Sequence, residues 1–497
     1  MQHPPHLPPV PTPTSPRPRL RSRFRPRPRL ALAGAALTAV IGLSGCLQAQ
    51  GPAPAASSGP PSGSASGPAS EASGGSAEPG TAAPSPGAGD AAPVQGGSGT
   101  LPDQATRTEA EQAVAGMSVE EKAGQVLVAT WDGADPGAVD AQIEQIDDLH
   151  LGGVIVMGSN VPTATGQGTT EQAGAEGGAQ GVDVEAMAGQ NRRVGEALAG
   201  DDRAWPGIIS VDQEGGPVAR LGAPLTQWPA ASAIGAAGDP VLTREAASGL
   251  ASELAGLGFT MDHAPVADVT TPGDAVILER AYGDDPEAVA EQVTAAVGGF
   301  QDAGLISSPK HFPGHGSVTT DSHVGLPVQQ KTPEQLAETD WKPFRAAAEA
   351  GAPSIMMGHI AVDAWDPEVP ATLEPQAYQA LREDVGFEGV AVTDALNMGA
   401  VTDVVGPGRA VDTGVSTPAG AALQAGADLL LMPEDEQTAH RDIVQAVASG
   451  AIPQQRLDEA AARVVAMQMA YAQHRETAPV GPSEPGSRTE LAARLQG

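Results

Sequence analysis

The feature that most constrains the fold of this 497-residue chain is a repeat of short apolar runs separated by Ala-rich segments. Most of the runs are continuously apolar, as expected of parallel strands that are buried on both faces of a sheet. There are eight of them, at residues 125–130, 153–157, 207–211, 259–264, 305–309, 354–358, 389–393 and 427–432. The chain between residues 105 and 475 is therefore predicted to alternate parallel strands with helices.

The segments between the runs have the composition and the boundaries of helices. The clearest helices are predicted at 183–198, 240–257, 286–303, 333–350 and 375–385; several begin with Pro and end near Gly, as helices commonly do. Eight strand–helix alternations predict an α/β fold, namely a single (β/α)8 barrel of the TIM type. An open, doubly wound sheet is the alternative, but it does not require eight strands, and no G-x-G-x-x-G motif follows the first run.

The first 45 residues have the pattern of a signal peptide. Arginines concentrated between residues 17 and 29 precede an uncharged stretch at 30–45, which is too short to span a bilayer comfortably. Residues 43–46, LSGC, resemble a bacterial lipobox, in which the cysteine is lipidated and becomes the mature N-terminus. A chance cysteine after the apolar stretch is the alternative. Because Cys46 is the only cysteine, a disulfide framework and a cysteine-based zinc site are excluded.

Composition divides the rest of the chain. Residues 46–104 are mostly Gly, Ala, Ser and Pro, and they are predicted to follow the lipidated Cys46 as a flexible, disordered linker. The barrel domain is predicted at 105–475 and a loose C-terminal tail at 476–497. Within the barrel domain, the Gly-, Thr- and Gln-rich insert at 160–182 is interpreted either as a mobile flap or as a tolerated disordered insertion. Anchor and linker together predict a location on the extracellular face of the cell membrane.

The charge balance restricts the partners. The formal net charge is −33, and many of the arginines lie in the first thirty residues, so the remainder is more acidic still. Such a surface repels phosphate backbones, and nucleic-acid binding is therefore excluded. Beyond the N-terminus no apolar stretch is long enough to cross a bilayer, so we expect contact with the membrane only through the lipid anchor.

Ionisable residues concentrate directly after the predicted strands. The windows are VDQEGGPVARL at 211–221, MDHAPVADV at 261–269, PKHFPGHGSVTTDSHVGLP at 309–327, MMGHI at 356–360 and VTDALNM at 392–398. They hold five of the ten histidines, at 263, 311, 315, 323 and 359. Barrel enzymes build their active sites at the carboxyl ends of the strands, and we therefore expect the site there.

Three features of these windows admit both a functional and a structural interpretation. Asp394 directly follows a predicted strand, as a catalytic carboxylate would, but Asp is also a good helix N-cap. Asp321 and His323 could form a general acid/base dyad, although the three residues 321–323 by themselves are more typical of a polar turn. His311, His315 and His323 invite a zinc interpretation, but the intervening Phe-Pro-Gly disfavours a helix and no H-E-x-x-H motif occurs. We predict no metal site and no cofactor.

Taken together, the windows resemble family 3 glycoside hydrolases, in particular the β-N-acetylglucosaminidase branch. The motifs that carry the resemblance, in order and spacing, are DQEGG at 212–216, APVADV at 264–269, ERAYGDDP at 279–286, KHFPGHG-x₄-DSH at 310–323 and TDALNM at 393–398. The resemblance covers roughly residues 110–475. The KHFPGHG-x₄-DSH block is the most specific of these motifs.

The resemblance implies a retaining exo-hydrolase that acts through a covalent glycosyl-enzyme. Asp394 matches the nucleophile of the family, and His323 matches its acid/base, with Asp321 as the dyad partner. The positions that match residues binding the terminal sugar are Asp212, Arg220, Arg280, Lys310 and His311. The chain departs from the family pattern at Pro217, where Arg is frequent, and at His263, where smaller or amide side chains are common. Neither departure affects the three catalytic positions.

The resemblance leaves rival functions open. A family 3 β-glucosidase or xylosidase usually has a second domain that supplies a glutamate acid/base, and an N-acetylglucosaminide phosphorylase would tolerate phosphate beside a histidine donor. Outside the enzymes, a sugar-binding lipoprotein would share the anchor and linker but requires two lobes around a hinge. The expected substrate is a GlcNAc-containing oligosaccharide, either a peptidoglycan fragment or a chitooligosaccharide.

Overall fold

The computed structural model describes residues 101–163, 181–200, 203–271, 277–318, 320, 322 and 325–496. The predicted signal peptide, Cys46 and the linker up to residue 100 lie outside these ranges, as does most of the predicted insert. Within these ranges, no helix combines the length and the apolar character needed to cross a membrane.

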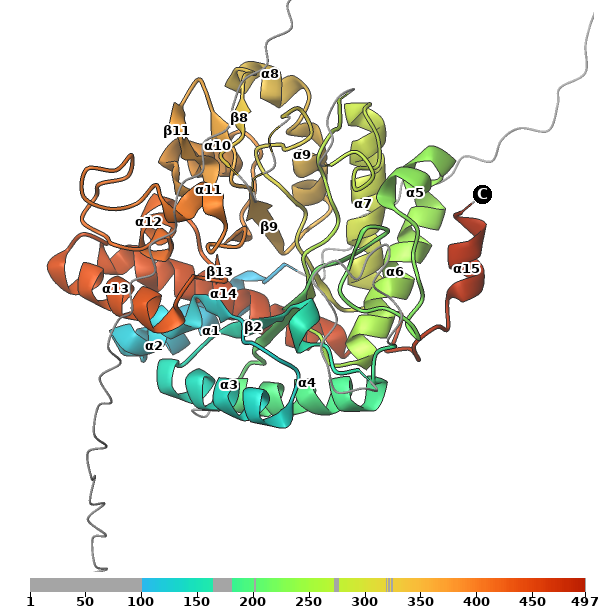
Figure 1. The fold of residues 1–497 in the computed structure, drawn as a ribbon, viewed down its shortest axis with the longest axis horizontal. Helices are drawn as coiled ribbons and strands as arrows, with labels where there is room; N and C mark the ends of the chain where they lie inside the picture. Colours follow the sequence, from blue (N-terminus) through green and yellow to red (C-terminus); the bar gives the residue numbers. More distant parts are fainter. Residues whose placement is uncertain are drawn as a thin grey trace, which may run out of the picture. The chain divides into compact units, whose positions relative to one another are not determined.

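Parallel strands form the centre of the fold (Figure 1). Six of them pair in the order β13-β1-β2-β3-β6-β7. Their bounds are β1 (Leu127–Ala129), β2 (Gly153–Val156), β3 (Ile208–Val211), β6 (Met261–Asp262), β7 (Ile306–Ser307) and β13 (Leu430–Leu431). A second parallel pair joins β9 (Ser354–Met357) to β12 (Val390–Thr393). Each of the eight predicted apolar runs contains one of these strands.

Backbone hydrogen bonds link the pair to both ends of the six-stranded sheet. Met356 N–H donates to the carbonyl of Pro309, two residues after β7, at 2.9 Å. On the other side, Thr393 N–H donates to the carbonyl of Leu429, just before β13, at 3.0 Å. The fold is therefore α/β, with a parallel sheet that curls strongly on itself.

Helices surround the strands (Figure 1). The longer ones are α1 (Gln104–Ala115), α3 (Pro136–Leu149), α4 (Val184–Leu198), α6 (Pro240–Gly256), α7 (Pro286–Asp302), α13 (Glu436–Ser449) and α14 (Gln454–Arg475). The shorter ones are α2 (Val119–Gln125), α5 (Ala231–Ala237), α8 (Pro333–Glu338), α9 (Lys342–Glu349), α10 (Pro375–Glu383), α11 (Gly399–Thr402) and α12 (Pro418–Ala425). Asp N-caps followed by Pro begin α3, α6 and α7, as the sequence pattern predicts.

One predicted helix is two helices. In the segment at 333–350, which was expected to form a single helix, α8 ends at Glu338 and α9 begins at Lys342. The break contains Asp340, which is fully buried and forms an ion pair with Lys331. Pro343 stands in the first turn of α9, a position that helices tolerate because no hydrogen bond is lost there.

The core has two layers. The larger one fills the space between the sheet and the surrounding helices. The smaller one lies inside the curled sheet, where each of the eight parallel strands or its immediate flank contributes an apolar side chain, such as Val128, Ile155 and Ile208. Val464, Met467 and Tyr471 of α14 pack against this inner cluster. Side chains of successive strand residues point to opposite faces, so one short strand serves both layers.

Smaller elements follow several strands. They are β4 (Gln213–Gly215) paired with β5 (Val218–Ala219), the three-stranded sheet β11 (Asp366–Pro370), β10 (Ala361–Val362) and β8 (Val328–Gln329), and the 3₁₀ turns at Gly158–Asn160 and Ala371–Leu373. The ends of the predicted insert are held together, because Thr163 and Val182 form an antiparallel bridge and Asp183 N–H donates to Pro162. Residues 164–180, between these ends, lie outside the described ranges.

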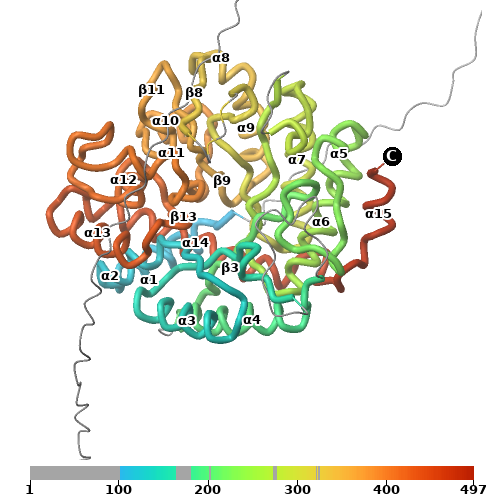
Figure 2. The backbone as a smooth tube through the Cα atoms, viewed as in Figure 1, coloured from blue at the N-terminus to red at the C-terminus, as the bar shows by residue number. Residues whose placement is uncertain are grey.

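The C-terminal segment is not the loose tail that its composition predicts. Ser483 N–H donates to the carbonyl of Ser252, and residues Thr489–Arg494 form the short helix α15. Ala492 and Leu495 are buried, so α15 is anchored next to α6 by apolar contacts (Figure 2). Two buried apolar residues in a Pro- and Gly-rich segment give no periodic pattern, and for this reason the sequence did not predict the helix.

Candidate active site

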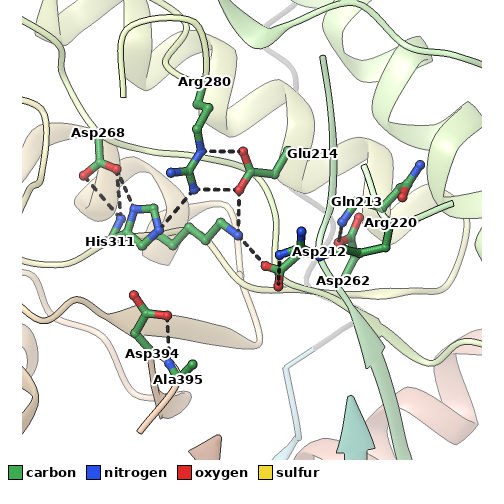
Figure 3. A network of polar contacts seen from close by, with 11 residues as sticks. Asp212, Gln213, Glu214, Arg220, Asp262, Asp268, Arg280, His311, Asp394 and Ala395 are labelled. Atoms are coloured by element: carbon green, nitrogen blue, oxygen red, sulfur yellow. Dashed lines mark hydrogen bonds and ion pairs between the residues drawn. The ribbon is translucent and has the colours of Figure 1, made fainter. Parts of the chain in front are cut away.

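A continuous network of charged side chains lies at the carboxyl ends of β3, β6 and β7 (Figure 3). Asp212 directly follows β3, and Glu214 lies in β4. Lys310, shortly after β7, places its Nζ 2.7 Å from Asp212 Oδ1 and 2.8 Å from Glu214 Oε1. Arg220 Nη2 lies 3.7 Å from the other oxygen of Asp212. One buried ammonium group thus joins two carboxylates from neighbouring segments.

Glu214 also binds Arg280, which comes from the loop after β6. The guanidinium donates through Nε and Nη2 to the two carboxylate oxygens of Glu214, at 2.9 and 2.8 Å. This bidentate geometry fixes the plane of the guanidinium. Arg280 Nη2 lies 3.4 Å from His311 Nε2, so the network extends to the imidazole.

The charges in this network stabilise one another. Burial raises the pKa of Asp212 and of Glu214, but the attraction of Lys310 and the neighbouring arginines lowers both by more than burial raises them. The pKa of Glu214 therefore falls to about 2, and that of Asp212 falls well below its usual range. Burial lowers the pKa of Lys310, but the two carboxylates raise it above its ordinary value. All three groups are therefore charged at neutral pH.

Asp268 holds the segment that carries His311. Its Oδ2 is 2.7 Å from His311 Nδ1, and its carboxylate accepts the backbone N–H groups of His311 and His315. Because a carboxylate accepts hydrogen bonds, the imidazole Nδ1 carries the proton and Nε2 presents a lone pair toward Arg280. Gly314, in the same turn, has φ +122° and lies against the Asp340 side chain, where a Cβ atom would collide. The turn therefore needs glycine there.

Asp394 directly follows β12, as predicted. Its backbone N–H donates to Met357 of β9, and its Oδ1 accepts the N–H of Ala395 at 2.8 Å. Figure 3 shows Asp394 beside the charged network. Burial raises the pKa of Asp394, but His359, His311, the Ala395 N–H and Lys310 lower it below its ordinary value, so the carboxyl is ionised at neutral pH. The alternative helix N-cap role does not apply, because α11 begins at Gly399 with Met398 as its N-cap.

Two further ionisable groups lie beneath the network. Asp262, at the end of β6, is fully buried, and burial together with Asp212 and Glu214 raises its pKa well above the ordinary value. Its carboxyl therefore takes up a proton more readily than that of an ordinary aspartate. His263 is also fully buried, and neither ring nitrogen has a hydrogen-bond partner in the described ranges. Burial lowers the pKa of His263 to about 4, so it is neutral at neutral pH.

The structure brings together all five residues that were predicted to bind the sugar, at positions 212, 220, 280, 310 and 311, with Asp394 nearby. The predicted acid/base His323 and its partner Asp321 lie outside the described residues, and no contact is assigned to them. Among the residues that are described, no group of three or more His, Cys, Asp and Glu side chains could hold a metal ion. The catalytic and binding roles remain predictions.

Sequence reasoning missed Glu214, Asp268 and His359 as parts of the site. Glu214 stands two positions from Asp212, whereas Asp268 and His359 stand in windows in which no residue was assigned a role. The only signal for Glu214 is its position shortly after a buried strand, where a carboxylate needs a cation; the cations themselves, Arg280 and Lys310, come from other segments. Nothing in the sequence indicates the contacts of Asp268 or His359, which depend on how separate strand ends meet.

Comparison with known proteins gives the family. The model of the glycosyl hydrolase family 3 N-terminal domain matches residues 118–467, more than two thirds of the chain. The chain belongs to glycosyl hydrolase family 3. The sequence-based prediction of the family is therefore confirmed.

Relatives within family 3 indicate the branch. The β-hexosaminidase of Thiobacillus denitrificans is 36% identical over 252 residues, which cover 48% of this chain and 68% of that protein. The β-hexosaminidase LpqI of Mycobacterium tuberculosis is 31% identical over 362 residues, covering 71% and 83% respectively. The structure of a family 3 β-N-acetylglucosaminidase from Paenibacillus superposes with a TM-score of 0.64 at 34% identity, covering 76% of this chain and 68% of that one. The prediction of the hexosaminidase branch is confirmed as well.

Proposed function

We propose that this family 3 protein is an exo-acting, retaining β-N-acetylhexosaminidase that releases terminal β-linked GlcNAc from peptidoglycan fragments or chitooligosaccharides. The observation that carries the proposal is Asp394, an ionised, largely desolvated carboxylate at a strand end beside a fixed array of hydrogen-bonding charges. The β-hexosaminidases to which the chain is similar support the choice of sugar.

Asp394 is assigned as the nucleophile. Its carboxylate attacks the anomeric carbon, and the bond from that carbon to the leaving oxygen breaks as a glycosyl ester forms. In the second step water attacks the anomeric carbon and the Asp394 carboxylate leaves. Two displacements at one carbon retain its configuration.

His323 is assigned as the acid/base, with Asp321 orienting its imidazole. In the first step His323 protonates the leaving oxygen, and in the second it accepts a proton from the attacking water. After it has given up its proton in the first step, His323 is a neutral imidazole, whereas the glutamate of other family 3 enzymes is then a negatively charged carboxylate.

The charged network is assigned to recognition of the terminal sugar. Asp212 and Glu214 accept hydrogen bonds, Arg220, Arg280 and Lys310 donate them, and His311 offers a lone pair on Nε2. Their mutual ion pairs hold these groups in place before the sugar binds, which reduces the entropy lost on binding.

The proposal also includes a closed barrel and a lipid anchor. The backbone hydrogen bonds on both sides of the β9–β12 pair support closure of the eight parallel strands into a single (β/α)8 barrel. We also propose that residues 1–45 are a lipoprotein signal peptide, that Cys46 carries the lipid and that residues 46–104 tether the enzyme to the extracellular face of the membrane.

The test is hydrolysis of p-nitrophenyl β-N-acetylglucosaminide compared with the corresponding glucoside, by the protein and by its D394A and H323A variants. Hydrolysis of the GlcNAc substrate alone, lost in both variants, supports the proposal. Preference for the glucoside would contradict the sugar assignment, and activity in D394A would contradict the nucleophile. Formation of GlcNAc 1-phosphate in phosphate buffer would indicate the phosphorylase instead.

A further inference from the structure

His359 follows β9 and is fully buried, in contact with the segment that carries Asp394. Its Nε2 lies 2.8 Å from the backbone carbonyl of Ala395, the residue next to Asp394. Its Nδ1 lies 2.7 Å from the hydroxyl oxygen of Thr372. The imidazole thus connects a 3₁₀ turn to the end of the strand that supplies the predicted nucleophile.

The hydrogen-bond partners fix where the protons of this imidazole are. A carbonyl only accepts, so Nε2 must carry a proton. The hydroxyl of Thr372 has one proton to donate. Its oxygen lies 2.9 Å from the carbonyl oxygen of Gly358, and 3.3 Å from that of Met357, which already accepts the N–H of Asp394. In the described part of the chain the carbonyl of Gly358 has no other donor. If Thr372 donated to Nδ1 instead, the carbonyl of buried Gly358 would be left unsatisfied.

Every group is satisfied only when Thr372 donates to Gly358 and His359 donates from both nitrogens. We propose that His359 is a buried imidazolium that acts as a positioning residue for Asp394, holding the loop after β12 and supplying the positive charge that the carboxylate faces. The proposal extends the proposed function, because it assigns a partner to the nucleophile of that reaction.

The positive charge of His359 is stabilised by a counter-ion, the carboxylate of Asp394. A buried cation without an opposite charge is strongly disfavoured, and the Asp394 carboxylate, which interacts electrostatically with His359, compensates that cost. The described side chains that lower the pKa of Asp394 come from two strand ends, with His359 after β9 and with Lys310 and His311 after β7. His359 is the strongest of these influences.

The imidazolium has a consequence for the second chemical step. When the glycosyl ester forms, Asp394 loses its negative charge and with it its attraction to the cation; when the ester breaks, the carboxylate returns and the attraction is restored. The cation therefore makes Asp394 a better leaving group, and it favours breakdown of the ester more than its formation.

The first test needs no substrate. Nitrogen-15 NMR of the full chain at neutral pH reports which ring nitrogens carry protons, and the His359 signals are identified by their loss in H359Q. Two protonated nitrogens are expected. A spectrum with one protonated and one unprotonated nitrogen would overturn the proposal. This readout stands whether or not the protein hydrolyses GlcNAc substrates, so the two proposals can fail separately.

Thr372 provides a matched pair of variants. In T372V the hydrogen bond from Nε2 to the carbonyl of Ala395 remains, but the hydroxyl that accepts from Nδ1 is gone. The signal of the second protonated nitrogen should therefore disappear. In T372S the hydroxyl remains and both signals should persist. Unchanged signals in T372V would contradict the assignment of the protons, and the comparison does not depend on whether H359Q folds.

Kinetics separate a charge effect from simple disruption. With a substrate whose leaving group departs easily, breakdown of the ester limits kcat. H359Q and T372V should lower kcat by roughly tenfold, equivalent to about one unit of pKa at the carboxyl, and KM should fall in parallel because the ester accumulates. A fall in kcat with unchanged or raised KM would refute the charge role.

Discussion

Two buried clusters of charge lie near opposite ends of the parallel strands, one around Asp428 and one around Lys310. They differ in how far their carboxylates are exposed and in how many hydrogen-bonding groups remain unused. Asp428, just before β13, is completely buried and is bound by Arg382, Arg456 and Arg463 at 2.7, 2.6 and 3.0 Å. It also accepts the N–H of Ala391. Burial raises the pKa of Asp428, but the three arginines lower it below the ordinary value.

The network around Lys310 contains similar groups in a different arrangement. Asp212 and Arg220 retain 17% and 18% of their side-chain exposure, while Asp428 has none. Neutral His263 lies beneath this network with both ring nitrogens lacking partners in the described ranges. Buried charge by itself therefore does not mark a site; a partly exposed carboxylate and unused hydrogen-bonding capacity at the carboxyl ends of the strands do.

The largest expected difference between the two clusters is the effect of a substitution on kcat. D394A should lower kcat by on the order of 10⁴-fold, because the covalent step loses its nucleophile. Thermal unfolding of this variant should stay close to that of the unmodified protein. D428N is the comparison: its folded fraction should keep the kcat of the unmodified protein, and a loss as large as that of D394A would place Asp428 in the mechanism.

The second prediction concerns stability. D428N should lower the free energy of unfolding by about 3–5 kcal/mol, because three arginines lose the charge that compensates their burial. D262N is a matched control at the other end of the strands: burial already disfavours the charged form of Asp262, and an amide can still accept the N–H of Gln213, so the change should stay within about 1 kcal/mol. Denaturant unfolding measures both. Equal losses would show that Asp262 is ionised.

The third prediction concerns acid. The pKa of His263 is lowered to about 4 in the folded protein from an ordinary 6.5, so unfolding takes up a proton between these values. The contribution of His263 to stability is therefore complete above pH 6.5 and is lost as the pH falls to 4, by on the order of 3 kcal/mol. H263F should remove this part of the pH dependence. An identical pH profile for H263F would mean that His263 is not buried as a neutral group.

The smallest expected effect is on substrate binding. E214Q weakens the ion pairs that hold Arg280 and Lys310, and it should lower kcat/KM about 10- to 100-fold, mainly through KM. E388Q is the control, because Glu388 forms an exposed ion pair with Arg107 and should have almost no effect. If the two variants behave alike, the Glu214 network is structural in the same sense as the Asp428 cluster.

The periodicity of the sequence predicts most of the fold, and it does so for a physical reason. Strands buried on both faces require continuous apolar runs, so all eight central strands are visible, as are the helices that begin with Asp and Pro. The α8–α9 break and α15 depend on a few individual contacts, namely the ion pair of Asp340 with Lys331 and the burial of Ala492 and Leu495, and these leave no periodic trace.

The site is predicted less completely. Motifs identify Asp212, Lys310 and Asp394, which lie at or shortly after the ends of strands, and strand ends of one sheet meet. The partners that orient them come from different motifs, and their pairing is set by loop geometry. The two carboxylates near Lys310 show this: the sequence assigns a role to Asp212, whereas the role of Glu214 appears only when Arg280 lies beside it.

The bridge between Thr163 and Val182 makes this point of the chain a natural attachment point for engineering. Because its two ends are already fixed to each other, the length of chain between them affects stability only through the slow logarithmic cost of closing a loop. A reporter domain whose own termini lie close together could be inserted there with little strain on β2 or α4. The enzyme and the inserted domain would then fold as two independent units on one polypeptide.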